Sequence, residues 1–380
     1  MLDRIQLMSE LKNISSSLFI DLKPTISLTK KLWSEMVNDP LFQARVKAST
    51  SWPTLPSWQN KLDDIYQVAG YKKPYKIIAT DGSQIYPDKH QGTSCALINI
   101  GTVMLDYKEE ISRAQCKTKP YIMHESNKDD TQEFCAEWID SKRQEYEFKA
   151  GIEYCTIKQQ ENMNSPLLYF LDGSLIFWHL EAKEPTLRQF FIDSYIALLE
   201  TFYRQKILMA GYISLPKGKD LVNLVRFHLE EKQQLLSQYN EPNNQEQLNS
   251  IVDSHIANFF LQPFERTNVF KSNSNITRYY PAHLKPYFFY LHVGSEIARI
   301  EVPAWIAANN TDLDLICAII QDQCIKGDGY PIGLAEAHEQ AVVKGPDREF
   351  FYMLLTKLGL EQEHQVTISR KSLKKRGLGI

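Results

Sequence analysis

The chain has 380 residues, of which 43% are hydrophobic and 11% aromatic, a composition typical of a globular protein with a large buried core. A net charge of −3, from 43 basic and 46 acidic residues, excludes a uniformly basic nucleic-acid coat protein but allows a local basic groove. No apolar run approaches the ~20 residues that cross a bilayer, and the N-terminus does not resemble a signal peptide, so we expect a cytoplasmic protein without a membrane segment.

The six cysteines are sparse, form no CxxC pair and have no histidine at zinc-finger spacing, which indicates reduced thiols. The sequence also lacks a phosphate-binding G-x-x-x-x-G-K-[ST] loop, so any ATP-driven step must come from a partner.

In chain order, residues 1–70 are expected to form a helical segment interrupted by prolines. A strand follows and ends at Asp81. Two apolar runs, Ser94–Ile100 and Thr102–Tyr107, are separated by Gly101 and predict an antiparallel meander with this first strand. The polar stretch 108–128 then leads into a long helix.

Alternating helices and strands continue the pattern. A helix is predicted over 130–157, a fourth strand ending at Asp172, a helix from Pro185 to Gln205 and a fifth strand over Ile207–Ser214. The order strand, strand, strand, helix, strand, helix, strand predicts an α/β fold. Its mixed sheet, flanked by helices, would be of the ribonuclease H-like type.

The rest of the chain is expected to hold a helix, a polar insertion at about 232–250, a strand pair over Tyr287–Val293 and Glu296–Val302, and three helices. These assignments give a helical segment over 1–70, a main domain over 71–360 and a basic tail over 361–380.

The sequence Asp-Gly-Ser occurs twice, at Asp81 and at Asp172, each time after an apolar run. Neighbouring strands that end in this way would bring two carboxylates together, which is costly unless a cation lies between them. The repeat therefore predicts a divalent metal site, although Asp-Gly is also common turn chemistry.

Two further ligands are predicted from helices. Glu147 and Glu145 point about 160° apart, so only one of them can face the sheet, and we favour Glu147, which shares a face with Arg143. His338 lies two turns into a helix that begins near Pro331, and the alternative for it is a core histidine. Because imidazole favours Mn²⁺ over Mg²⁺, manganese is the expected ion and magnesium the alternative.

Basic and aromatic side chains near these positions are candidates for contact with nucleic acid, through phosphates and stacked bases respectively. The alternative is that the basic groups are merely solvated and the tyrosines packed in the core. The candidates are Lys142, Arg143, Lys217, Lys219, Tyr212 and Tyr330.

Four segments occur in the order and spacing of one known family: Thr80–Ser83, Leu171–Leu175, Arg299–Pro303, and Gly329–Pro331 running to Ala337–Glu339. Together they resemble the NurA family of DNA-repair nucleases, and Ala210–Ser214 fits as well. The resemblance spans roughly residues 75–355 and leaves the first 70 residues and the polar insertion unmatched.

The resemblance implies a ribonuclease H-like core and manganese-dependent cleavage of DNA, largely from 5′ to 3′, with single-strand endonuclease activity and a role in processing double-strand breaks. It implies metal ligands at Asp81, Asp172, His338 and Glu147, with Glu145 as the alternative to Glu147. It further implies a homodimer that works with a hexameric HerA-type ATPase. The competing hypotheses are an inactive DNA-binding or adaptor subunit and an RNA-directed nuclease of the same fold.

Overall fold

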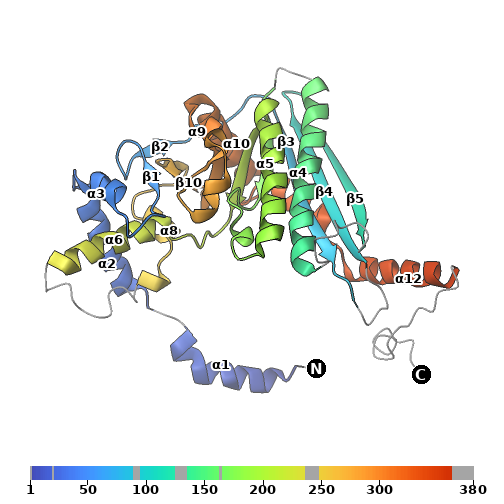
Figure 1. Ribbon diagram of the computed structural model, residues 1–380, viewed down its shortest axis with the longest axis horizontal. Helices are drawn as coiled ribbons and strands as arrows, with labels where there is room; N and C mark the ends of the chain where they lie inside the picture. The colour runs from blue at the N-terminus through green and yellow to red at the C-terminus, as the bar shows by residue number, and fades with distance from the viewer. Residues whose placement is uncertain are drawn as a thin grey trace.

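The structure is a computed structural model that describes residues 2–18, 21–88, 95–124, 135–161, 165–235 and 248–361. One large sheet runs through the molecule, with helices packed on its faces, as Figure 1 shows. The prediction of a mixed α/β fold is therefore confirmed. Among the described residues, no helix is both long enough and apolar enough to span a membrane.

The half of the sheet that carries the predicted site has the spatial order β5-β4-β3-β6-β7. Its strands are β3 (Tyr75–Ile85), β4 (Ala96–Tyr107), β5 (Arg113–Met123), β6 (Leu167–Asp172) and β7 (Leu208–Ile213). Strands β3, β6 and β7 are parallel, whereas β4 and β5 are antiparallel to their neighbours. The carboxyl ends of the three parallel strands consequently meet at one edge of the sheet.

The sheet continues beyond β7 through strands from the second half of the chain and two short strands from its N-terminal part. These are β11 (Ile297–Pro303), β10 (Pro286–His292), β9 (Phe270–Lys271) and β1 (Ser57–Trp58), with β8 (Glu265–Thr267) joining β10 to β2 (Ile65–Gln67). The antiparallel pairing of β10 with β11 confirms the predicted strand pair.

Helices cover both faces near the parallel strands. The long helix α4 (Ala136–Glu161) and α5 (Pro185–Arg204) lie side by side across the strands in Figure 1. On the other face α11 (Ile332–Ala341) packs against β3 and β4, next to α10 (Asn310–Lys326). The short helix α9 (Ala304–Ala307) follows β11, and α12 (Gly345–Glu361) projects from the body.

The N-terminal helices share a second core with a later part of the chain. Helices α2 (Lys23–Val37) and α3 (Phe42–Ala48) pack against α6 (Asp220–Leu235) and α8 (Asp253–Ala257), whereas α1 (Arg4–Leu18) lies apart in Figure 1. Four 3₁₀ helices complete the described elements: Trp178–Leu180, Leu248–Ser250, Asn275–Tyr279 and Ala282–Leu284.

Two predictions about the first strands are wrong. Strand β3 does not end at Asp81 but continues to Ile85, and the two runs around Gly101 form the single strand β4. Both glycines were interpreted as turn residues, but each is a site where a helix approaches the strand. A Cβ atom on Gly101 would lie 2.6 Å from the backbone nitrogen of Ala341, and one on Gly82 would lie 2.6 Å from Cγ of Arg143.

The polar stretch 108–128 was also interpreted incorrectly, because its residues 113–123 form β5 at the edge of the sheet. Nearly all of β5 is exposed, so it lacks the alternation of apolar and polar residues that marks a half-buried strand. Residues 49–70 likewise contain the short strands β1 and β2 instead of helix. Residues 130–134 of the predicted long helix, 236–247 of the insertion and 362–380 of the tail lie outside the described residues.

Candidate metal-binding site

Asp81 and Asp172 lie next to each other at the carboxyl edge of the parallel strands. The ladder between β3 and β6 ends at the pair Thr80–Leu171, and each aspartate is the next residue of its strand. Asp172 is the last residue of β6, whereas β3 continues past Asp81 paired with β4 alone. The structure thus brings the two predicted carboxylates together, although only one of them is at the end of a strand.

Glu147 reaches this edge from helix α4 because Gly82 has no side chain. A Cβ atom on Gly82 would lie 2.7 Å from Glu147 Oε1, so any larger residue would displace the side chains that α4 places there. Adjacent residues of a strand face opposite sides of the sheet, which puts α4 on the face opposite to that of Asp81. The carboxylate of Glu147 therefore approaches the aspartates around the edge of the sheet.

The electrostatic environment of Glu147 is unusual for a carboxylate. Its side chain is buried, and within the described part of the chain Oε1 has no hydrogen-bond partner. The Arg143 Nε atom lies 3.4 Å away without hydrogen-bond geometry. Burial raises the pKa of Glu147 to about 8; the neighbouring Asp81 and Asp172 add to the rise, and Arg143 opposes it. A group of this kind binds a proton or a cation strongly.

His338 reaches Asp81 from the other face of the sheet. Gly101 is paired with Asp81 in the ladder and shares its face, and its missing side chain lets the α11 backbone lie directly on β4. The His338 Nδ1 atom lies 2.8 Å from Asp81 Oδ2 and donates to it, and the imidazole is otherwise largely exposed. His338 is therefore not a core histidine.

Tyr330 supports the second aspartate. Its hydroxyl donates to Asp172 Oδ2 at 2.9 Å, and its ring packs edge-on against Tyr212. Burial raises the pKa of Asp172, the Tyr330 hydroxyl opposes this, and the Asp81 carboxylate adds to it. Asp81, Asp172, Glu147, His338 and Tyr330 thus converge from two strands, two helices and the turn before α11.

Glu145 and Lys142 lie outside this group. Glu145 is buried on another side of α4, where Lys142 Nζ contacts it at 2.8 Å and Lys149 forms a second ion pair. Burial works to raise the pKa of Glu145, but the two ammonium groups outweigh it and the net shift is downward. Lys142 also lies within 5.7 Å of the ring centres of Trp138 and Tyr146. It is a packed partner of Glu145, not a free cation that faces a phosphate.

The prediction that Tyr212 contacts nucleic acid is wrong, because Tyr212 is fully buried in β7 and cannot stack on a base. Its strand lies between β6 and β11, and its hydroxyl donates to Glu296 Oε1 at 2.8 Å. Arg143 is half-buried, and its Nη1 donates to the Gln84 side chain at 3.1 Å. Lys217 is exposed after β7, and Lys219 donates to the carbonyl oxygen of Asn249.

The donor set fits a divalent cation in its chemistry. Three carboxylates and one imidazole are hard or borderline ligands, and the buried Oε1 of Glu147, which accepts no hydrogen bond from the described residues, offers its lone pairs to a cation. As the side chains stand, no three His, Cys, Asp or Glu residues of the described segments form a preassembled ligand group. The contact between His338 and Asp81 takes up one ligand atom from each of two donors.

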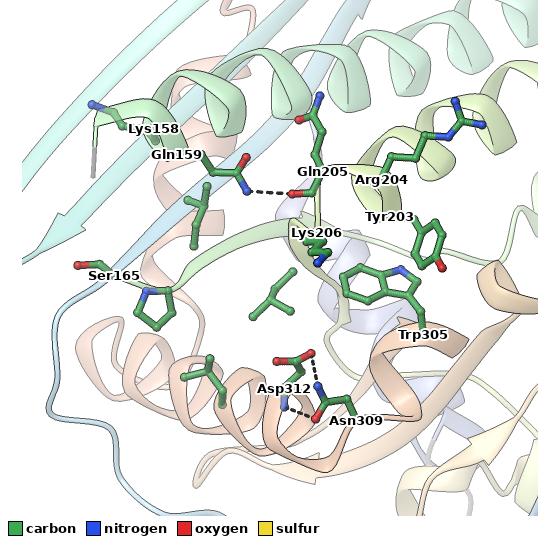
Figure 2. A pocket seen from close by; sticks show the side chains of 14 residues that line it. Lys158, Gln159, Ser165, Tyr203, Arg204, Gln205, Lys206, Trp305, Asn309 and Asp312 are labelled. Carbon is green, nitrogen blue, oxygen red and sulfur yellow. Dashed lines mark hydrogen bonds between the residues drawn. The ribbon is translucent and has the colours of Figure 1, made fainter. Parts of the chain in front are cut away.

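A large cavity lies far from these residues. It has a volume of about 1070 Å³ and is lined by the first residues of β6 and β7, at the amino end of the parallel strands, together with Lys206 and Trp305 (Figure 2). It contains none of the predicted site residues.

Glu301 contacts the turn after Asp172, and the sequence predicts no role for it. It is fully buried in β11, and its Oε2 accepts hydrogen bonds from the Ser174 hydroxyl at 2.7 Å and from the Leu175 amide at 2.8 Å. The signal available was the spacing of Arg299 and Glu301, two opposite charges on one face of an otherwise apolar strand.

Several solved structures are similar to this chain over most of its length. No curated protein matches the chain in sequence. A crystal structure of NurA is 10% identical and covers 93% of this chain and 98% of its own, with a TM-score of 0.36. A crystal structure of NurA with manganese is also 10% identical, covers 88% and 98%, and has a TM-score of 0.36. A third, of NurA bound to dAMP and manganese, is 10% identical, covers 86% and 94%, and has a TM-score of 0.33.

These superpositions are loose, and the assignment rests on the sequence of the domain itself. The family model of the NurA domain matches residues 75–343, which is well over half of the chain. This range contains both Asp-Gly-Ser motifs, Glu147 and His338. The chain therefore belongs to the NurA family.

Proposed function

We propose that this chain is a divalent-metal-dependent nuclease that hydrolyses DNA, with Mn²⁺ as its ion. The observation that carries the proposal is the convergence of Asp81, Asp172 and Glu147 at one sheet edge, where the buried Glu147 Oε1 accepts no hydrogen bond from the described residues. Membership of the NurA family and the manganese and dAMP in the crystal structures of other NurA proteins support it. The spatial order β5-β4-β3-β6-β7 supports a ribonuclease H-like core.

Asp81, Asp172, Glu147 and His338 would hold the ion. When bound, a divalent ion supplies neutralisation of phosphate charge and activation of water for attack. The Asp81 contact keeps the Nδ1 proton of His338 directed at a carboxylate, so Nε2 is the nitrogen able to act as a ligand. Tyr330 holds Asp172 in place, and Arg143 beside Glu147 and the exposed Lys217 would contact phosphates.

The finer features of the proposal come from the family. They are digestion from 5′ to 3′, single-strand endonuclease activity, a role in double-strand-break processing, a homodimer, a HerA-type ATPase partner and a cytoplasmic location. The division into an N-terminal segment over 1–70, which holds helices and the short strands β1 and β2, a nuclease domain over 71–360 and a basic tail over 361–380 belongs to the same proposal.

The test is cleavage of end-labelled single- and double-stranded DNA, and of matched RNA, with Mn²⁺, Mg²⁺ or EDTA. Asp81→Asn is compared with Asp106→Asn, a strand aspartate five residues from the partner of Asp81 on β4 and so about 17 Å along the sheet. We expect manganese-dependent DNA cleavage that Asp81→Asn abolishes and Asp106→Asn retains.

Other outcomes contradict the proposal in distinct ways. Preference for RNA indicates the RNA-directed alternative. No cleavage even with the ATPase partner, combined with tight DNA binding, indicates an inactive adaptor. Equal activity of both variants removes Asp81 from the site.

A further inference from the structure

The turn that follows Asp172 folds back over strand β7. Gly173 has a φ of +140°, a conformation that favours glycine, and its amide donates to the carbonyl oxygen of Tyr212 at 2.9 Å. The space for this turn exists because Gly211 has no side chain: a Cβ atom there would lie 2.5 Å from the carbonyl oxygen of Gly173. The position of the Asp172 carboxylate thus depends on how firmly the turn is held over β7.

Glu301 holds the turn from the strand beyond. It is paired with Gly211 in the ladder, so its side chain extends on the face that Gly211 leaves open. Its Oε2 accepts from the Ser174 hydroxyl at 2.7 Å and from the amides of Leu175 at 2.8 Å and Ile176 at 3.3 Å. One buried oxygen therefore gathers three donors of the segment that begins at Asp172.

Arg299 holds Glu301 in turn. Its Nε donates to Glu301 Oε1 at 2.7 Å, and its Nη1 donates to Asp220 Oδ2 at 2.7 Å. The guanidinium also lies 3.7 Å from the centre of the Phe288 ring. Both charged side chains are buried, so neither can move to solvent without breaking a buried ion pair.

We propose that Glu301 is a positioning residue for the metal site: it fixes the turn after Asp172, and Arg299 fixes Glu301. The proposal rests on the proposed function, because it assigns Glu301 a task at a metal site. The substitution Glu301→Gln exposes this task. An amide has one acceptor oxygen, so it can face either the three turn donors or the Arg299 donor, but not both.

The chain offers a control that makes similar hydrogen bonds at an exposed position. Glu184 also accepts from one hydroxyl and two main-chain amides, those of Thr186 and Leu187, at 2.9 to 3.1 Å, but it caps the start of α5. Glu184→Gln therefore removes the same kind of interaction away from Asp172. Ser174→Ala serves as a milder second variant, since Ser174 is only partly buried and loses a single hydroxyl.

Two quantities are measured on the full chain: Mn²⁺ binding, from the electron paramagnetic resonance signal of free Mn²⁺, and the Mn²⁺ concentration that gives half-maximal DNA cleavage. We expect Glu301→Gln to weaken both by about 10- to 100-fold, the range for groups that orient metal ligands, with cleavage restored at high Mn²⁺. Ser174→Ala should weaken them by about fivefold. Glu184→Gln should match the wild type.

The results separate the two proposals. If the wild type neither binds Mn²⁺ nor cleaves DNA, the proposed function fails. A second outcome is that the wild type does both while Glu301→Gln and Ser174→Ala bind Mn²⁺ as tightly as the wild type. In that case Glu301 is merely structural, even when Glu301→Gln lowers the melting temperature. Should Glu301→Gln not fold, the Ser174→Ala result alone decides between these outcomes.

Discussion

The close packing of α11 on Gly101 gives a sharp prediction for Gly101→Ala. The added Cβ atom would lie 2.6 Å from the backbone nitrogen of Ala341 and 2.7 Å from the carbonyl oxygen of Ala337. Ordinary contacts between such atoms are about 3.5–4.0 Å, so the helix must move by about 1 Å. Since this helix carries His338, its 2.8 Å contact with Asp81 would open beyond hydrogen-bond distance.

We expect Gly101→Ala to lose about 1–3 kcal/mol of unfolding free energy by overpacking. A displacement of 1 Å at a reacting centre costs up to about 100-fold in rate, so DNA cleavage should fall much more than stability. Unfolding in urea and cleavage with Mn²⁺ measure the two effects. The control is Gly70→Ala, where a Cβ atom would meet nothing within 4 Å.

The reasoning would be refuted if Gly101→Ala and Gly70→Ala had the same activity and stability. That result would mean that α11 does not lie on β4 at Gly101, and that His338 is held by something else.

Three further predictions test other parts of the structure. Glu147→Gln should reduce metal-dependent cleavage at least about 100-fold, the upper end of the loss for groups that only support a ligand, whereas Glu145→Gln should cost about 1–2 kcal/mol of stability and spare cleavage; the reverse pattern would contradict the placement of α4. Gly211→Ala should push the Gly173 carbonyl away, lower stability by about 1–3 kcal/mol and weaken Mn²⁺ binding, as calorimetry would show. Burial, with Asp220 beside it, raises the pKa of Asp253 to about 6. Between about pH 4 and 6 this carboxyl group then binds more protons in the folded state than in the unfolded state. Its contribution to the unfolding free energy should therefore fall by at most about 3 kcal/mol as pH rises through this window. Asp253→Asn should flatten that slope in denaturation experiments, and an unchanged slope would count against a raised pKa.

The order of helices and strands could be predicted from the sequence because buried strands such as β6 and capped helices such as α5 carry strong local signals. The extent of β3 and β4 could not be predicted, because a glycine in the sequence can either form a turn or allow a helix to pack closely on a strand. Gly82 and Gly101 serve the second purpose, which depends on α4 and α11, elements distant in the sequence.

The candidate site shows the same division. Asp81 and Asp172 are adjacent because their strands pair, and the repeat of Asp-Gly-Ser pointed to both. The role of Glu301 was hidden, because its contacts with the Ser174 turn cross 127 residues of sequence. The prediction that Tyr212 stacks on a base was wrong for a related reason. The local sequence around an aromatic residue does not show whether its side chain is exposed for stacking or buried in the core.

The long sequence separation between the site residues bears on how the protein is made. Asp172 and His338 are 166 residues apart, a stretch that takes roughly 8–33 s to synthesise at typical rates. During that interval a nascent chain contains the carboxylate pair but not the imidazole, and it also lacks the β11 strand until residue 303 has been added. A growing chain therefore lacks part of the candidate site, and any product that stops before α11 lacks His338 permanently.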